Sequence, residues 1–207
     1  MERTRPGNWA SKLRRFVVAE REEHCDFCSK AIAPRHSHLI ERATGKFFCA
    51  CPQCALVLGT GDRFVALVVR THALTDFNLT DAEWDDFRIP IDLAFVFHST
   101  PAQGPVAIYP GPAGATQSQL GVAAWTRVVA AHPMLADLDP DVEALLVNRM
   151  NGAREYYRVS IDRCYSLIGL IRMHWRGLSG GAEVWDAVHD YFTKLRDEIA
   201  PGDMVHG

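Results

Sequence analysis

The sequence predicts an α+β fold, in which a small cysteine-rich module precedes an α+β domain with an antiparallel or mixed sheet and several helices. Three observations support this prediction. Five of the six cysteines lie within one short segment near the N-terminus. Runs of β-branched and aromatic residues, bounded by proline and glycine, follow between residues 62 and 110. Farther along the chain, apolar residues recur at three- and four-residue steps, which is typical of amphipathic helices.

The composition excludes several classes of protein. Hydrophobic residues make up 48% of the 207 residues and charged residues 23%, which are ordinary values for a globular protein. The net charge of −3 argues against a dedicated nucleic-acid binder, because such proteins carry a strongly basic face. No stretch approaches the roughly 20 apolar residues of a membrane span, and the N-terminus lacks an apolar signal-peptide core. Without a signal peptide, a cluster of free thiols predicts that the protein is located in the reducing cytoplasm.

The clustered cysteines form two closely spaced groups, C-D-F-C and C-A-C-P-Q-C. Two C-x-x-C pairs present four thiolates to one tetrahedral metal ion when the intervening segment folds back. We therefore expect Cys25, Cys28, Cys51 and Cys54 to be the metal ligands. Cys49 lies two residues before Cys51 and is the alternative ligand in its place.

Zinc is the metal that this pattern favours, and iron is the alternative. Rubredoxins also bind iron with two C-x-x-C units, but the aromatic and glycine pattern around their knuckles is missing here. Four thiolates already complete a tetrahedron, so the neighbouring His24, His36 and His38 are not expected among the ligands.

The segments around the cysteines predict a knuckle, a hairpin and a helix. Residues 38–42 and 47–49 have the pattern of two strands that flank a turn. Pro52 suits the first turn of a helix, and Gly59 suits its end. A knuckle, a hairpin and a helix that carries the second cysteine pair resemble a treble-clef zinc finger.

The expected organisation therefore has three parts. A basic N-terminal arm occupies residues 1–22, a four-cysteine zinc-finger-like module residues 23–61, and an α+β domain residues 62–207. The arm's short amphipathic pattern is typical of a helix packed on the body, with a docking arm as the alternative.

The larger domain is predicted from turn and capping signals. A capping box at Thr80 and Glu83 indicates a short helix, and the acidic residues around it indicate a solvated face. Residues 109–116 are predicted to form a loop that leaves a strand and enters a helix at Thr116. Thr116 and Gln119 have the pattern of a second capping box. Further elements are strands at 63–70, 93–97, 106–109, 143–150 and 155–161, with Asn151-Gly152 as a hairpin turn, and helices at 161–175 and 185–199.

Nothing in the sequence requires an enzyme. The motifs G-x-S-x-G, H-E-x-x-H and the Walker motif are absent, and a four-thiolate site has no open position for a substrate. Cys164 lies on the apolar stripe of a helix, which indicates a buried, inert thiol. An enzyme acting through the 109–116 loop, Cys164 and His174 is therefore the less favoured interpretation.

Several longer motifs are similar to those of a known family. Besides the two cysteine motifs, the segments I-P-I-D-L-A-F-V-F, Y-P-G-P-A-G-A-T-Q-S and C-Y-S-L-I-G-L-I-R-M-H-W-R-G-L-S-G-G resemble an uncharacterised, mainly actinobacterial family. The resemblance spans roughly residues 23–198. Its members are typically encoded near NiFe hydrogenase genes, which implies a soluble helper in hydrogenase assembly, metal-centre maturation or electron transfer.

The expected function is accordingly that of a non-catalytic, zinc-binding accessory protein with a hydrogenase subunit or maturation factor as its partner. A rubredoxin-like iron protein that serves a hydrogenase is the first alternative. A nucleic-acid-binding regulator is the second, because many treble clefs bind DNA or RNA; only the basic arm would supply the positive charge.

Overall fold

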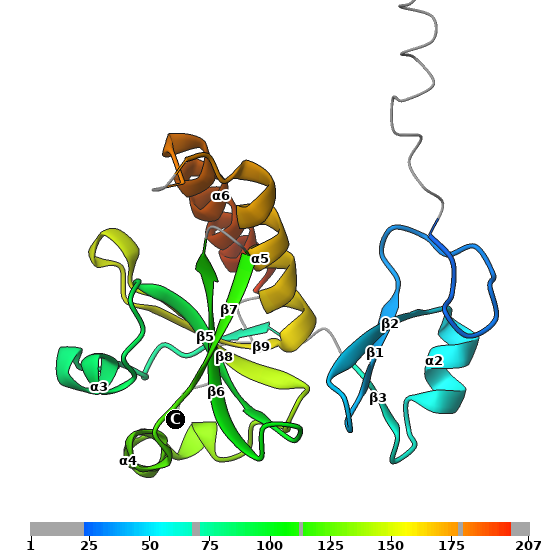
Figure 1. The fold of residues 1–207 in the computed structure, drawn as a ribbon, viewed down its shortest axis with the longest axis horizontal. Coiled ribbons are helices and arrows are strands. Elements are labelled where there is room, and N and C mark those ends of the chain that lie inside the picture. Colours follow the sequence, from blue (N-terminus) through cyan, green and yellow to red (C-terminus); the bar gives the residue numbers. More distant parts are fainter. Residues whose placement is uncertain (1–22, 68–70, 112–113, 178–179, 200–207) are drawn as a thin grey trace, which may run out of the picture.

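The structure is a computed structural model that describes residues 23–67, 71–111, 114–177 and 180–199. The basic arm expected at residues 1–22 lies outside these ranges. The described part is an α+β protein with two antiparallel sheets and several helices, as the sequence predicts (Figure 1). None of the helices in these ranges is both long and apolar enough to cross a bilayer.

A six-stranded sheet forms the centre of the larger domain. Its strands pair antiparallel throughout the described residues. In spatial order they are β4 (Thr71–Ala73), β9 (Glu155–Ser160), β8 (Glu143–Asn148), β5 (Leu93–Ser99), β6 (Gly104–Gly111) and β7 (Gly114–Gln119). The turn between β8 and β9 contains Asn151 and Gly152, both with positive φ, which confirms the predicted hairpin.

Helices cover both faces of this sheet. The long helices α5 (Ile161–His174) and α6 (Ala182–Glu198) pack on one face, and α3 (Asp81–Asp86) and α4 (Val122–Ala131) on the other (Figure 1). Successive side chains of a strand point to opposite faces. A central strand between two helical layers is therefore buried on both faces, and in β8 every residue is buried, with apolar side chains at its four inner positions, residues 144–147.

The segment before α4 differs from the sequence prediction. Thr116 does not cap a helix; it lies in β7, opposite Tyr109 of β6, and α4 begins only at Val122. The capping-box pattern was wrong because Gly114–Gln119 pairs with β6 along its whole length, and the hydrogen bonds of this pairing outweigh one capping bond. Leu120 is then buried in the core between strand and helix.

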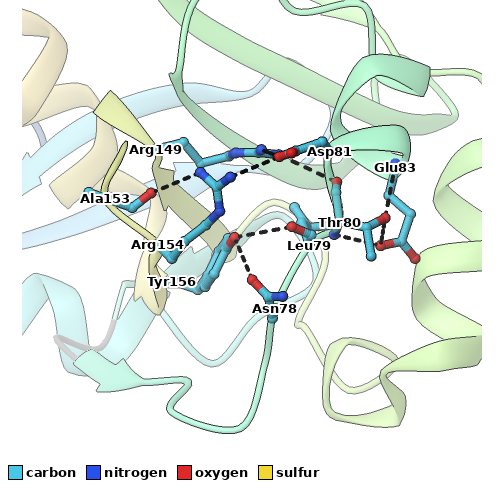
Figure 2. Close-up of polar contacts among 9 residues, drawn as sticks. All are labelled: Asn78, Leu79, Thr80, Asp81, Glu83, Arg149, Ala153, Arg154 and Tyr156. Atoms are coloured by element: carbon cyan, nitrogen blue, oxygen red, sulfur yellow. Dashed lines mark hydrogen bonds and ion pairs between the residues drawn. The ribbon is translucent and has the colours of Figure 1, made fainter. Parts of the chain in front are cut away.

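Part of the acidic segment is an ion-pair network and not only a solvated face (Figure 2). Thr80 and Glu83 form the predicted capping box at the start of α3. Asp81 accepts from Arg149 and, at 2.8 Å, from Arg154. The buried guanidinium of Arg149 also lies 5.3 Å from the centre of the Trp84 ring. These contacts fix α3 to the β8–β9 hairpin.

The N-terminal module is built on a three-stranded sheet. Its strands are β1 (Ser37–Glu41), β2 (Lys46–Ala50) and β3 (Phe64–Ala66), with β1 in the middle, and α2 (Pro52–Leu58) follows β2. The third strand lies beyond residue 61, at which the sequence analysis ends the module. The buried core of the module is small and consists of Leu39, Ala50 and Ala55.

The module packs against the body near the start of α5. Ile40 belongs to the same buried cluster as the α5 and α6 side chains, and the ring of Phe47 lies 5.0 Å from that of Tyr165. The Nδ1 atom of His38 lies 3.0 Å from Asp162 Oδ2 in the first turn of α5. The finger therefore has both an apolar and a polar contact with the larger domain.

Candidate metal centre

The first cysteine pair lies on a tight knuckle. The N–H of Cys25 donates to Lys30 O at 2.8 Å, and the N–H of Ser29 donates to Cys25 O at 2.8 Å. Ser29 has a φ of 59°, which turns the chain back after Cys28. This local geometry turns the chain sharply through the C-D-F-C segment, so both thiols lie on one knuckle.

The second pair lies at the beginning of α2. Cys51 is the N-cap residue, and its Sγ accepts from the N–H of Cys54 at 3.5 Å. Pro52 occupies the first turn, where its missing N–H breaks no helical hydrogen bond. One helical turn therefore places both sulfurs at the same end of α2, and Gly59 ends the helix as predicted.

The fold brings the two pairs together. The Sγ atoms of Cys25, Cys28, Cys51 and Cys54 all lie within 4.8 Å of one another. Those of Cys28 and Cys51 are 3.7 Å apart, close to the separation of about 3.8 Å that tetrahedral Zn–S bonds of about 2.3 Å impose. The group is compatible with a treble-clef metal site; the ligands and the metal remain predictions.

The protonation preferences within this group differ between its members. Burial raises the pKa of Cys25. Hydrogen bonds from the backbone N–H groups of Cys51, Phe27 and Cys28 lower it by a larger amount, so that the pKa is about 6. The hydrogen bond with Cys51 and burial raise the pKa of Cys54 to about 12. The knuckle is thus built to stabilise a thiolate, and a metal ion would displace the remaining protons on binding.

Aromatic rings fix the knuckle onto the sheet. Phe27, between the two cysteines of the first pair, lies 5.4 Å from the Phe48 ring and 5.3 Å from the Phe64 ring. The rings of Phe48 and Phe64 are themselves 5.4 Å apart. Such clustered rings contribute apolar contact on one side of the cysteine group. They pack beside the small core of the module, on which Cys54 also lies.

Cys49 lies in a different group. Its N–H donates to Asp26 Oδ2 at 2.6 Å and its carbonyl accepts from the N–H of Asp26 at 2.9 Å, so β2 is bound to the knuckle. Its Sγ lies within 4.8 Å of a ring nitrogen of His36 and of His38. No local sequence pattern predicts this grouping; the signal that could have revealed it is the hairpin register, which places His38 opposite Cys49.

The residues of the less favoured enzymatic interpretation lie on different elements of the fold. Cys164 is fully buried in the main core, and burial raises its pKa well above that of a free thiol. Such a thiol is inaccessible and poorly nucleophilic, as the sequence predicts. Residues 109–111 and 114–116 lie in the paired strands β6 and β7, and His174 is the last residue of α5.

Comparison with curated proteins and with solved structures finds no significant match to this chain. A family model matches residues 24–199, which include the whole cysteine module and nearly all of the larger domain. The chain therefore belongs to DUF5947, a family of unknown function.

Proposed function

We propose that this protein is a non-catalytic, zinc-binding accessory protein that assists assembly or maturation of a NiFe hydrogenase through protein–protein contacts. The four-sulfur group carries this proposal. Four thiolates fill the coordination of a zinc ion and leave no position for water or substrate, so such an ion stabilises a fold and does not catalyse a reaction. The hydrogenase as partner rests on the sequence resemblance alone, and the proposed location is the reducing cytoplasm.

The size of the module supports a structural role for the metal. Only Leu39, Ala50 and Ala55 form its own buried core, and modules with so little apolar burial generally need a metal or disulfides to stay folded. All six cysteines are free thiols, so a metal is the available cross-link. Metal binding and folding of this module are therefore expected to be coupled.

The identity of the metal is tested by colour and elemental analysis. Freshly purified protein is expected to be colourless and to contain zinc bound by four sulfurs. A red protein with thiolate-to-iron absorption would contradict the zinc assignment and support the rubredoxin-like alternative.

The outward face of α2 supports a role in binding a partner. Leu56 and Val57 are 76% and 74% exposed, and the helix that carries them begins after Cys51 and contains Cys54. Exposed apolar patches mark protein contact surfaces, and we propose that these two side chains belong to one. A zinc site would then serve to keep this helix in position.

Affinity capture with the full-length protein from its native host tests the partner. We expect a hydrogenase subunit or maturation factor to co-purify, and Leu56→Asp with Val57→Asp to abolish the capture. Val122→Asp is the matched control, because Val122 is 65% exposed but lies on α4 in the larger domain.

The accessory function fails if no hydrogenase protein co-purifies and deletion of the gene leaves hydrogen uptake intact. A steeply salt-dependent gel shift with DNA or RNA would instead favour a nucleic-acid-binding regulator.

A further inference from the structure

A second group of metal-binding side chains lies on the hairpin of the module. His38 is directly opposite Cys49 in the β1–β2 register, and side chains at opposite positions of an antiparallel pair lie on the same face, about 5 Å apart at Cβ. His36 precedes His38 by two residues, so an extended chain places both rings on that face. The two ring centres are 4.7 Å apart.

The hydrogen bonds of the two histidines determine which ring nitrogen carries the proton. His36 Nδ1 donates to Ala33 O at 2.9 Å, and His38 Nδ1 donates to Asp162 Oδ2 at 3.0 Å. In the neutral ring, with the proton on Nδ1, each Nε2 carries a lone pair. A carboxylate or carbonyl that holds the other ring nitrogen is the usual arrangement around a metal-bound histidine.

The Nε2 atom of His36 has no hydrogen-bond partner in the described structure. His36 Nε2 is buried, and the His36 side chain is only 6% exposed. A buried ring nitrogen that lacks a partner is unfavourable, because it has lost its hydration without a replacement. A metal ion would satisfy it.

We propose that His36, His38 and Cys49 form a second metal site, which binds a divalent transition ion of the zinc class through two imidazoles and one thiolate. The three ligand atoms already lie within 4.8 Å of one another, and metal bonds of about 2.0–2.3 Å require only small side-chain adjustments. Imidazole and thiolate together favour such ions over magnesium or calcium.

The second site differs in kind from the four-sulfur group. Three protein ligands leave one position of a tetrahedral ion open, which water or an external ligand can occupy. The bound ion is therefore exchangeable or reactive, whereas an ion held by four sulfurs is enclosed. This inference rests on different side chains from the proposed accessory function, so either can fail without the other.

The metal content of the full-length protein tests the second site. After equilibration with zinc and gel filtration, we expect about two zinc ions per chain in the wild type. The variants His36→Ala, His38→Ala and Cys49→Ser should each retain about one. His24→Ala is the matched control and should keep both, because His24 is exposed and lies outside the group.

Cobalt substitution shows whether the variants remain folded. The first Co²⁺ bound should give the intense charge-transfer absorption of four sulfurs, and this spectrum should persist in all variants. The second should add a weaker charge-transfer band, as expected for a single thiolate, and it should be lost in the three variants. A single zinc per wild-type chain, or a second ion that persists in all three variants, would overturn the proposal.

Discussion

The close packing of α2 against β3 gives a quantitative test of how the fold positions the cysteine group. Gly59 ends α2, and a Cβ at this position would lie 2.5 Å from Ala55 O and 2.6 Å from Ala66 Cβ. It would also lie 3.1 Å from Leu39 Cδ2. Favourable contacts between carbon atoms begin at about 3.5 Å, so a methyl group overlaps its neighbours by roughly 1 Å.

Neither of the two nearest atoms can rotate away. Ala55 O belongs to the backbone of α2, and Ala66 Cβ is attached directly to the backbone of β3. Gly59→Ala must therefore move the helix relative to the strand, and overpacking of this kind costs about 1–3 kcal/mol. If metal binding is coupled to folding of the module, as we propose, this cost should weaken metal binding about 5- to 150-fold.

Competition with a chromophoric chelator measures this change, with the four-sulfur Co²⁺ spectrum as the readout. The matched control is Gly61→Ala, because a Cβ there meets only Leu58 O at an ordinary 3.5 Å. Its affinity should equal or slightly exceed that of the wild type, since alanine restricts the unfolded chain. Wild-type affinity in Gly59→Ala, or an equal loss in Gly61→Ala, would refute the reasoning.

Three further predictions concern the larger domain. Arg149→Ala should lower the free energy of urea unfolding by about 2–4 kcal/mol, because it removes a buried, ion-paired guanidinium, whereas the more exposed Arg154→Ala should cost less than about 1 kcal/mol. Hydrogen bonds from the side chain and backbone of Thr80 lower the pKa of Glu83 below 4.5, so its stabilising effect is present above that pH and is lost as the pH falls through the lowered pKa. The stability difference between wild type and Glu83→Gln should therefore shrink in acid. Cys164→Ala should leave the metal content unchanged, because this thiol lies in the main core and belongs to neither ligand group.

The elements around the cysteines could be predicted because their signals are local. The two C-x-x-C pairs, Pro52 at the start of α2 and Gly59 at its end each act within a few residues. The capping box at Thr80 is equally local, and the structure confirms it. In each case the hydrogen-bond partner lies within one turn of the chain, so the sequence window contains the whole interaction.

The sequence predictions fail where a residue far away in the chain determines the local structure. Thr116 satisfies a capping pattern, yet pairing with Tyr109 in β6 makes it part of a strand. The acidic segment does not indicate that Asp81 pairs with Arg149, which lies 68 positions away in the chain. The contact between His38 and Asp162 spans 124 positions, and no local pattern contains both residues. Only the register of the hairpin could have indicated the neighbours His38 and Cys49.

The two ligand groups are mechanically connected, which sets the order in which they can form. Cys49 and Cys51 are two residues apart, and Asp26 on the knuckle holds the backbone of Cys49 on both sides. When the knuckle folds and brings the four sulfurs together, it therefore also fixes β2, the strand that carries Cys49. His38 adds a contact with Asp162 at the start of α5, so an ion at the second group would bind to a side chain that links the module to the body. We therefore expect a metal at the four-sulfur group to order the module, and a metal at the second group to strengthen the contact of the module with the larger domain.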